Sequence, residues 1–411
     1  MAYGISSPTE SGELAGQPGL TGLPENNLIR RLLRALPITQ TAERFLMKGQ
    51  WLGRFSGTNN GAAVLEIDAV GKYFEGRAYV FDDNLALPST TAFVRIPADR
   101  NSFTIEKLGL TPLDPVNMDF AEWRNLQHRF PDVSFPNTAH TEWQWDDRSV
   151  NVKWKTDIGT FGEGSLEKST ARRPSELKPL KIRSWDEFRK YVRGLEHYRY
   201  IYRGQESNKW RLCTAFHRTE RSDLIRFLQV DAGALHQHLS SLTAHVFNLL
   251  NPIENAAFLS LAQHHGYPTP LLDWTYSPFI GAYFAFKRAR QKKGKVRIFI
   301  FDRTQWWQDQ PQLQKLAPAR PHFSVLDAIS INNLRLVPQQ ALSTVTNVED
   351  IEEFISSKER PDRKYLQAID LPIEQRTEVL NELSTMGINA GSLFPGLDGT
   401  CDQLKDRFFG V

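Results

Sequence analysis

The sequence predicts two folded domains of different class, an antiparallel β-barrel or β-sandwich followed by an α+β domain. The 411 residues are too many for one ordinary domain, and a content of 40% hydrophobic and 11% aromatic residues is enough for packed cores. Residues 41–170 consist of short alternating runs divided by turn residues, which is typical of antiparallel strands. From 183 onward, strands and helices mix without the alternation of a doubly wound sheet.

Composition excludes several classes of protein. The net charge of +3 gives no general argument for nucleic-acid binding. The two cysteines, Cys213 and Cys401, exclude a disulfide framework and a cysteine-rich zinc site, and Cys213 reads as a small buried thiol. No apolar run is long enough to span a bilayer, and the N-terminus lacks the pattern of a signal peptide. We therefore expect a cytoplasmic protein without disulfides or a membrane span.

The first forty residues divide into two segments. Residues 1–25 are rich in Gly, Ser, Pro and Glu and predict a mobile tail. Residues 26–40 contain "NNLIRRLLRALP", which places apolar residues on one helical stripe and arginines on the other. This amphipathic helix either docks on its own protein, which we favour, or touches a membrane or nucleic acid.

The region 41–170 supplies the strands of the first domain. The stretch "WLGRFSGTNNGAAVLEIDAVGKYFEGRAYVFDD" alternates around turn residues, and "TAFVRI", "SFTIEKL", "EWQWDD", "SVNVKW" and "FGEGSLEKS" continue the pattern. Trp143 and Trp145 lie on one strand face, as do Val150, Val152 and Trp154. Nothing here gathers a nucleophile, a base and oxyanion donors. We expect the aromatic residues to form the core, in a domain that could recognise a ligand the sequence does not name.

Residues 171–182 are rich in proline and charge and predict a linker to a domain at 183–411. Ser184, with Glu187 three residues on, predicts a capping box. Next come a strand "YRYIYRG", a helical region at about 222–250, a helix that ends at Gly266, a strand "LLDWT", a helix that begins after Ser277 and a strand "KVRIFIFD".

Three places in this domain could carry chemistry. In "YIYRGQ", Arg203 and Gly204 end a strand, which suits an anionic ligand although such pairs are usually structural. In "LLDWTYSPF", Thr275 and Ser277 bring hydroxyls and free backbone N–H groups to a strand–helix junction that can receive a phosphate or ribose. In "RLVPQQ", Gln339 and Gln340 offer amide groups.

Asp273, beside Trp274 in an apolar strand, requires a partner, and we expect an arginine or a backbone N–H group. A structural role for this acid is at least as well supported as a catalytic one. His264 and His265 are adjacent and point in different directions, so they cannot chelate one metal in the way of an i,i+4 pair. A metal-dependent hydrolase built on these histidines and Asp273 is therefore disfavoured, and we expect no metal.

The segments "YRG", "AQHHGYPTPLLDWTYSPFIGAYFA", "RLVPQQ" and "GINAGSLFPGLDG", in this order over 183–411, resemble the FRG domain. The resemblance implies a divergent ADP-ribosyltransferase-like fold, in which two small sheets hold NAD+ in a cleft. It assigns Arg203 to the ribose or phosphate, Thr275 and Ser277 to the nicotinamide ribose, and Tyr283 either to stacking on nicotinamide or to packing. The resemblance implies that the following residues contact NAD+: Tyr202, Arg203, Gly204, Asp273, Thr275, Ser277, Tyr283, Gln339 and Gln340.

In active ADP-ribosyltransferases, the third of the sequence motifs that bind NAD+ commonly contains a glutamate. The resemblance places Gln339 and Gln340 at the corresponding positions of this sequence. Glutamine brings no negative charge to a developing cation, and Glu349 and Asp273 are the alternative carboxylates. We take Arg203, Thr275 and Gln340 as the candidate catalytic residues.

The resemblance implies an NAD+-dependent ADP-ribosyltransferase or NAD+ glycohydrolase, which fits a bacterial toxin or an anti-phage effector acting on a macromolecule that the sequence does not name. Its N-terminal β domain would then select a target or sense a trigger. The alternative is a non-catalytic module that binds or senses a nucleotide.

Overall fold

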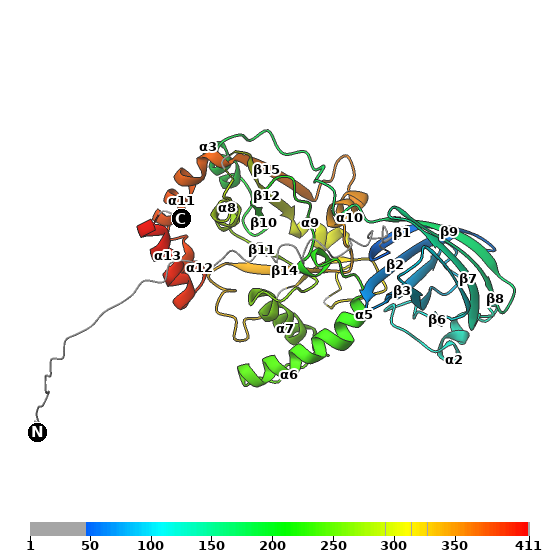
Figure 1. Ribbon diagram of the computed structural model, residues 1–411. Helices are drawn as coiled ribbons and strands as arrows, with labels where there is room; N and C mark the ends of the chain where they lie inside the picture. Colours follow the sequence, from blue (N-terminus) through cyan, green and yellow to red (C-terminus); the bar gives the residue numbers. More distant parts are fainter. Residues whose placement is uncertain (1–46, 292, 314, 327, 410–411) are drawn as a thin grey trace, which may run out of the picture. The chain divides into compact units, whose positions relative to one another are not determined.

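The computed structural model describes residues 47–409 except 292, 314 and 327. The predicted tail at 1–25 and the predicted amphipathic helix at 26–40 lie outside the described residues. The described strands form two sheets, and in both every neighbouring pair of strands is antiparallel (Figure 1).

The first sheet has the strand order β5-β7-β8-β9-β1-β2-β3-β4-β6. Because β4 also lies beside β5, the sheet nearly closes on itself, and the alternatives of barrel and sandwich resolve to a barrel. Its strands are β1 (Gly49–Gly57), β2 (Gly61–Val70), β3 (Tyr73–Asp82), β4 (Thr90–Pro97), β5 (Ser102–Gly109), β6 (Thr111–Pro112), β7 (Thr138–Trp145), β8 (Ser149–Thr156) and β9 (Phe161–Lys168).

The alternating sequence of these strands produces the barrel interior. In β7, alternate residues from Ala139 to Trp145 are buried, and the residues between them are exposed or half-buried. Trp143 and Trp145 pack in one core with Val150 and Val152 of the neighbouring strand. The predicted common faces of β7 and β8 are therefore confirmed.

The second sheet has the order β13-β14-β11-β10-β12-β15. One apolar core includes side chains of α3, α8 and α11, and another, which includes side chains of α9 and α10, packs around the same sheet. The strands are β10 (Tyr200–Gln205), β11 (Leu271–Thr275), β12 (Lys295–Asp302), β13 (Phe323–Leu326), β14 (Ala341–Thr346) and β15 (Leu366–Pro372). A mixed α+β class follows from these elements.

The helices follow the predicted order, with one difference. The helical region expected at about 222–250 includes a π-helical segment. It ends early, at Thr243, because Ala244 adopts a left-handed backbone with φ of 51°. The helices are α2 (Trp123–Leu126), η1 (Gln127–Arg129), α3 (Trp185–Arg193), α4 (Ala215–Arg218), α5 (Leu224–Arg226), η2 (Phe227–Asp231), α6 (Ala232–Thr243), α7 (Pro252–His264), α8 (Pro278–Lys287), α9 (Arg303–Asp309), α10 (Ile351–Lys358), η3 (Ile373–Gln375), α11 (Arg376–Thr385), α12 (Ala390–Leu393) and α13 (Leu397–Phe409). None of the helices that the structure describes is long and apolar enough to cross a bilayer.

The segment 171–182 is irregular, as a linker would be, but it is not free of the second sheet. Leu177 packs against one core of that sheet, and Leu180 and Ile182 pack against the other. The capping box after it is incomplete: Ser184 Oγ accepts from the Glu187 N–H group, but the Glu187 carboxylate accepts from the N–H group of Arg183.

The barrel bonds directly to the part of the chain that follows it, and the described residues of both belong to one compact unit. Asp68 of β2 accepts hydrogen bonds from the N–H groups of Ser222 and Asp223 at 2.7 and 3.1 Å and pairs with Arg221. Gln50 of β1 donates from its side chain to the carbonyl of Asn347 at 2.8 Å.

Candidate functional site

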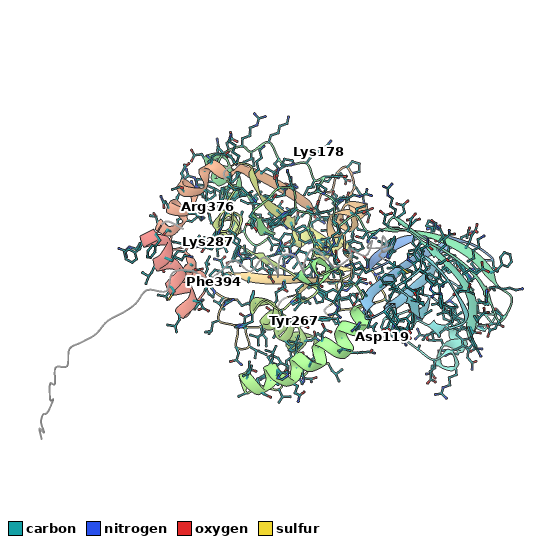
Figure 2. The ribbon with its side chains drawn as sticks, viewed as in Figure 1. Asp119, Lys178, Tyr267, Lys287, Arg376 and Phe394 are labelled. Carbon is teal, nitrogen blue, oxygen red and sulfur yellow. The ribbon has the colours of Figure 1, made fainter. Side chains whose placement is uncertain are left out.

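A cleft of about 970 Å³ lies beside the second sheet, and several of the predicted site residues line it. It is bounded by the C-terminal end of β10, by β11, by the end of α7 and by α8. Two of its lining residues, Tyr267 and Phe394, are labelled in Figure 2. Of the predicted site residues, the cleft is lined by Tyr202, Arg203, Gly204, Asp273, Thr275 and Gln339.

The cleft opens where the two central strands of the sheet separate. Only one residue pair, Tyr202 with Thr275, joins β10 to β11 in register, whereas β10 pairs with β12 over its whole length. Beyond that pair, Gly204 and Gln205 have partners in β12 and none in β11. Strands that diverge in the middle of a sheet leave room for side chains and for a ligand between them.

Arg203 occupies this opening. Its Nη1 donates to the main-chain carbonyl of Asp273 at 2.7 Å, so the side chain satisfies a β11 acceptor that faces the gap. Its Nε is buried and makes no hydrogen bond within the described part of the chain. Burial lowers the pKa of Arg203 to about 10, and the charge of Arg218 adds to this effect. The guanidinium therefore stays positive at neutral pH while its Nε lacks a partner.

Gly204 is required by packing. A Cβ atom there would lie 2.0 Å from the carbonyl oxygen of Gly281 and 2.5 Å from the N atom of Ala285, both in α8. The lack of a side chain at this position lets a helix lie against the strand, and Gly204 also lines the cleft.

The cleft is strongly basic. Only Glu206 and Asp273 are acidic among its lining residues. The basic residues come from segments far apart in the chain: Arg172, Arg173, Arg203, Lys209, Arg211, Arg218, Arg288 and Arg335. Such a cleft favours an anionic ligand, because each arginine can donate two parallel hydrogen bonds to a phosphate group.

Several of these cleft arginines are fixed by hydrogen bonds or ion pairs within the protein. Of all the arginines that line the cleft, the sequence analysis named only Arg203 as a site residue. Arg211 pairs with Asp350 at 3.0 Å, Arg218 donates to the carbonyl of Cys213 at 2.7 Å, and Arg335 donates to the carbonyl of His264. The guanidinium of Arg335 also lies 5.5 Å from the ring centroid of Phe394. Two local signals were present: the basic pair in "TARRP", which we read as part of a linker, and Arg335 at the start of "RLVPQQ", to which we gave no role.

The side chain of Asp273 faces partners other than those predicted. One carboxylate oxygen accepts from Gln263 Nε2 at 3.1 Å and the other accepts from Ser343 Oγ at 3.4 Å. The expected arginine bonds to the main-chain carbonyl of this residue and not to its carboxylate. The prediction of an arginine or backbone partner for the carboxylate was wrong, and the acid remains half-buried in the cleft wall.

Thr275 holds the junction together. Its hydroxyl donates to the carbonyl of Gln339 at 2.7 Å and accepts from the N–H group of Ser277 at 3.1 Å. Ser277 does not line the cleft, and its hydroxyl caps α8 by accepting from Ile280. Both hydroxyls predicted for ribose contact thus have structural partners.

The two glutamines point to different surroundings. Gln339 is buried, and its amide nitrogen donates to the carbonyl of Leu393 at 2.9 Å. Gln340 is exposed, has a left-handed backbone with φ of 46°, and does not line the cleft. Glu349, an alternative carboxylate, is buried against β1, where it accepts from the N–H group of Gln50 at 3.3 Å.

The aromatic candidates are also divided. Tyr202 is buried and touches the cleft, whereas Tyr283 lies in the core between α8 and the sheet, where burial raises its pKa. The residue after it, Phe284, lines the cleft. The structure thus gives Tyr283 the packing role that was one of its two predicted alternatives.

His264 and His265 reach the cleft but do not gather acidic or sulfur ligands. His264 Nδ1 lies 2.6 Å from Asn333 Nδ2, and His265 is exposed. Within the residues described, no group of three or more His, Cys, Asp or Glu side chains is placed to hold a metal ion. Cys213 and Cys401 are both free, and burial raises the pKa of the Cys213 thiol to about 12.

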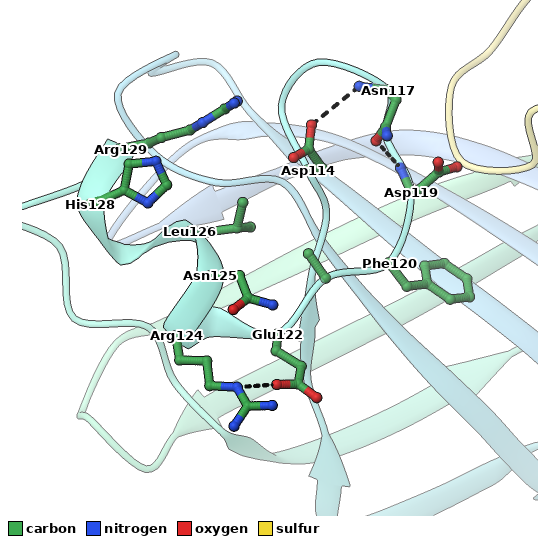
Figure 3. A pocket seen from close by; sticks show the side chains of 11 residues that line it. Asp114, Asn117, Asp119, Phe120, Glu122, Arg124, Asn125, Leu126, His128 and Arg129 are labelled. Carbon is green, nitrogen blue, oxygen red and sulfur yellow. Dashed lines mark hydrogen bonds and ion pairs between the residues drawn. The ribbon is translucent and has the colours of Figure 1, made fainter.

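A separate hollow of about 420 Å³ lies on the surface beside α2 (Figure 3). Its polar groups bond within their own loop: Asp114 accepts from the N–H groups of Val116 and Asn117, Asn117 accepts from Asp119, and Glu122 pairs with Arg124. Most residues around it are exposed. We assign no function to this hollow.

Comparison with known proteins identifies one part of the chain. Residues 198–294, which run from just before β10 past the end of α8, match the FRG domain. The protein therefore contains an FRG domain. The match includes Arg203, Asp273 and Thr275 of the cleft, and the FRG domain follows the barrel in the chain.

Outside the FRG domain, the comparisons add little. No curated protein matches the sequence. Two solved structures of redesigned β-barrels align with the chain, one of them mFAP1 bound to DFHBI, at 8% and 10% identity over 30% of this chain and 91% and 94% of theirs. Both have a TM-score of 0.21, which is too low to carry an argument.

Proposed function

We propose that the cleft of the FRG domain binds a phosphate-bearing nucleotide, with NAD+ as the ligand, and that the domain transfers ADP-ribose from it. The observation that carries the proposal is Arg203: a positive side chain in the opening of the sheet whose buried Nε has no described partner. A phosphate oxygen of the pyrophosphate would supply that partner, and the surrounding arginines would neutralise the remaining charge.

The volume of the cleft supports a ligand of this size. At about 970 Å³ it lies at the upper end of the range usual for small-molecule sites, which is roughly 300–1,000 Å³. The divergence of β10 from β11 beyond the pair Tyr202 and Thr275 leaves room for such a ligand beside the sheet.

The reaction would break the bond between ribose C1′ and the nicotinamide nitrogen, and the bonding electrons would leave with neutral nicotinamide. A bond would form between C1′ and an oxygen or nitrogen of a macromolecule, or of water, and the acceptor would release a proton to solvent. A carboxylate near C1′ would stabilise the positive charge that develops on the ribose. Asp273 is the acid that we propose for this role, because it lies in the cleft wall beside Arg203.

Nucleotide binding without turnover is the second candidate. It is favoured by Gln339, which lines the cleft without bringing a carboxylate and whose amide nitrogen donates to the carbonyl of Leu393. In this version the domain would sense a nucleotide and leave it intact. In both versions we propose that the barrel recognises a target or a trigger.

The test uses the full chain. Calorimetry with NAD+ measures binding, chromatography measures nicotinamide release, and labelled NAD+ in a cell lysate reveals transfer to protein or nucleic acid. Arg203→Lys keeps the charge but loses the planar fork, Asp273→Asn removes the carboxylate, and Arg54→Ala, which changes an exposed arginine of the barrel, is the control.

The results separate the candidates. Transferase or glycohydrolase activity predicts nicotinamide release that Arg203→Lys and Asp273→Asn reduce by at least about tenfold, equivalent to roughly 1.4 kcal/mol, while Arg54→Ala leaves it unchanged. Binding with intact NAD+ after hours supports the sensing role. If folded protein neither binds nor cleaves NAD+ at high concentration, both versions are wrong.

A further inference from the structure

The barrel contains a second cavity that has a different chemical character from the cleft. It has a volume of about 400 Å³ and lies inside the barrel at one end. It is lined by the ends or beginnings of β1, β2, β3, β4, β7, β8 and β9, together with residues 132–136. Eight-stranded barrels can hold one small ligand in this position.

The cavity exists because small residues face the interior at this end. Ala63, Ala78, Ala92, Ala139 and Gly164 all line it. At the other end, the inward positions carry larger side chains that fill the core, namely Trp51, Ile67, Phe74, Val94, Ile96, Trp145 and Val150. In β4, for example, Ala92 lines the cavity, whereas Val94 and Ile96, which belong to the same core, do not.

The walls are apolar and rich in aromatic rings. Phe55 and Trp154 meet edge to face, with their ring centroids 5.6 Å apart, and Trp143 and Phe135 add further ring surface. Ile158 and Phe161 also line the cavity and are 45% and 61% exposed, so apolar surface continues to the rim. Aromatic walls of this kind favour a flat ring system, which stacks or meets them edge-on.

The charge of the lining excludes an acidic ligand. No Lys, Arg or His is among the described residues that line this cavity, and the charged residues there are Asp82 and Asp132. A carboxylate or phosphate placed here would lose water without gaining a cation. This is the opposite of the cleft, where arginines predominate.

One buried polar group remains available to a ligand. Thr141 is 3% exposed, and its hydroxyl accepts from Trp143 Nε1 at 2.8 Å. A hydroxyl carries one proton to donate, and no hydrogen bond from Thr141 to another described residue uses it. An acceptor atom on the ligand could therefore be bound deep in the cavity.

We propose that the barrel is a binding site for an uncharged, flat, largely aromatic small molecule that bears a hydrogen-bond acceptor. The Thr141 hydroxyl donates to that acceptor, and Phe55, Trp143 and Trp154 contact the rings. This inference does not depend on the proposed function of the cleft.

The experiment titrates the full chain with Nile red, a neutral planar dye whose emission shifts to the blue in apolar surroundings. Cis-parinaric acid, an apolar carboxylate, is the charged comparison. Ala63→Phe fills the cavity from β2, and Ala62→Phe places the same side chain on the neighbouring residue, which does not line it. Thr141→Val removes the donor and nearly preserves the shape.

We expect saturable binding of one Nile red per chain with a blue shift, and binding of cis-parinaric acid at least about tenfold weaker. Ala63→Phe should weaken Nile red binding by about tenfold or more, whereas Ala62→Phe should not change it. Thr141→Val should lower the affinity for Nile red, which carries a carbonyl acceptor, by about fivefold to tenfold.

Other results would overturn the proposal. They are the absence of saturable binding, equal affinity in Ala63→Phe and wild type, or tighter binding of the carboxylate. If Ala63→Phe lowers the melting temperature, Gly164→Ala gives a milder test, since a Cβ atom there meets its neighbours at 3.4 Å or more. Full Nile red affinity in both Gly164→Ala and Thr141→Val would then place the dye elsewhere and refute the site.

Discussion

Arg203 and Asp273 are joined across the opening of the sheet by a side-chain-to-main-chain bond of 2.7 Å. The arginine acts as a substitute for the strand amide that would otherwise face the Asp273 carbonyl. This bond uses Nη1 and leaves the buried Nε without a described partner. Arg203 thus donates one hydrogen bond to the main chain of β11, and its Nε–H group remains available to donate to a ligand.

The first prediction concerns salt. Binding of NAD+ in the cleft should weaken when NaCl is raised from about 0.05 to about 0.5 M, because arginine–phosphate attraction is screened. Nile red binding in the barrel should change little over the same range. Calorimetry and fluorescence titrations at several salt concentrations measure both. A salt-independent NAD+ affinity would argue against the arginine-lined cleft as its site.

The second prediction concerns Gly204. Gly204→Ala should lower the free energy of unfolding by about 3 kcal/mol, because its Cβ atom would overlap the Gly281 carbonyl oxygen and displace α8. The control is Gly233→Ala in α6, where a Cβ atom meets nothing within 4 Å, and it should be neutral or stabilising by up to about 1 kcal/mol. Urea denaturation compares the two. Equal stability of both variants would contradict the packing argument.

The third prediction concerns Thr275. Thr275→Val should reduce stability by about 1–2 kcal/mol and should weaken NAD+ binding, because the hydroxyl fixes the Gln339 carbonyl and the Ser277 N–H group. Thr275→Ser keeps the hydroxyl and should restore both properties. Thermal denaturation and calorimetry supply the measurements. If Thr275→Ser is as unstable and binds NAD+ as weakly as Thr275→Val, the hydroxyl is not the group of Thr275 that determines these two properties.

The fourth prediction concerns pH. Burial lowers the pKa of His217 to about 3, whereas the unfolded value is about 6.5. Below about pH 6.5 the unfolded chain therefore binds a proton that the folded chain does not, and stability falls as pH falls toward 3. His217→Leu should remove up to about 1.4 kcal/mol per pH unit from this slope between pH 4 and 6.

The comparison with wild type isolates this histidine. His322, whose pKa burial also lowers to about 3, contributes the same sign in both proteins. Buried Glu66 and Glu349, whose pKa values are raised by burial, contribute the opposite sign in both. Identical slopes for His217→Leu and wild type would refute the assignment.

The fifth prediction concerns the contact between the barrel and the rest of the chain. Asp68→Ala should lower stability by about 3 kcal/mol, because it leaves the N–H groups of Ser222 and Asp223 without their buried acceptor and removes one of the two carboxylates that pair with Arg221. Asp83→Ala, which breaks an exposed pair with Arg54, should change stability by less than about 0.5 kcal/mol. Chemical denaturation distinguishes them, and a small effect of Asp68→Ala would show that this contact contributes little.

Much of the fold could be predicted from local patterns. The strands from Gly49 to Lys168 alternate in the sequence as they do in the barrel, and β11, α8 and β12 begin or end at residues that the sequence indicated. Barrel and sandwich could not be distinguished, because alternation does not reveal whether β4 and β5, which lie near opposite ends of the strand order, meet. The early end of α6 depends on one left-handed residue, Ala244, which is not a typical helix terminator.

The candidate site could be predicted only in part, because it is assembled from distant segments. Arg203, Asp273 and Thr275 were expected together and lie around one cleft. Arg172 was not expected there, because no spacing in the sequence connects it with Arg203 or Asp273. Arg335 was overlooked, although it lies four residues before Gln339. The hydroxyls of Thr275 and Ser277 were read as free for a ligand, but local bonds to the main chain use them.

The single residue pair between β10 and β11 has a consequence for genetics. The room for a ligand between the two central strands depends on how those strands pack, and exchanging the surrounding arginines does not alter that packing. Loss-of-function alleles should therefore concentrate at residues that set the spacing of the two strands, such as Gly204 and Tyr202, and not only among the arginines that meet the ligand. A saturation mutagenesis screen would reveal this architecture as intolerance at apolar and glycine positions.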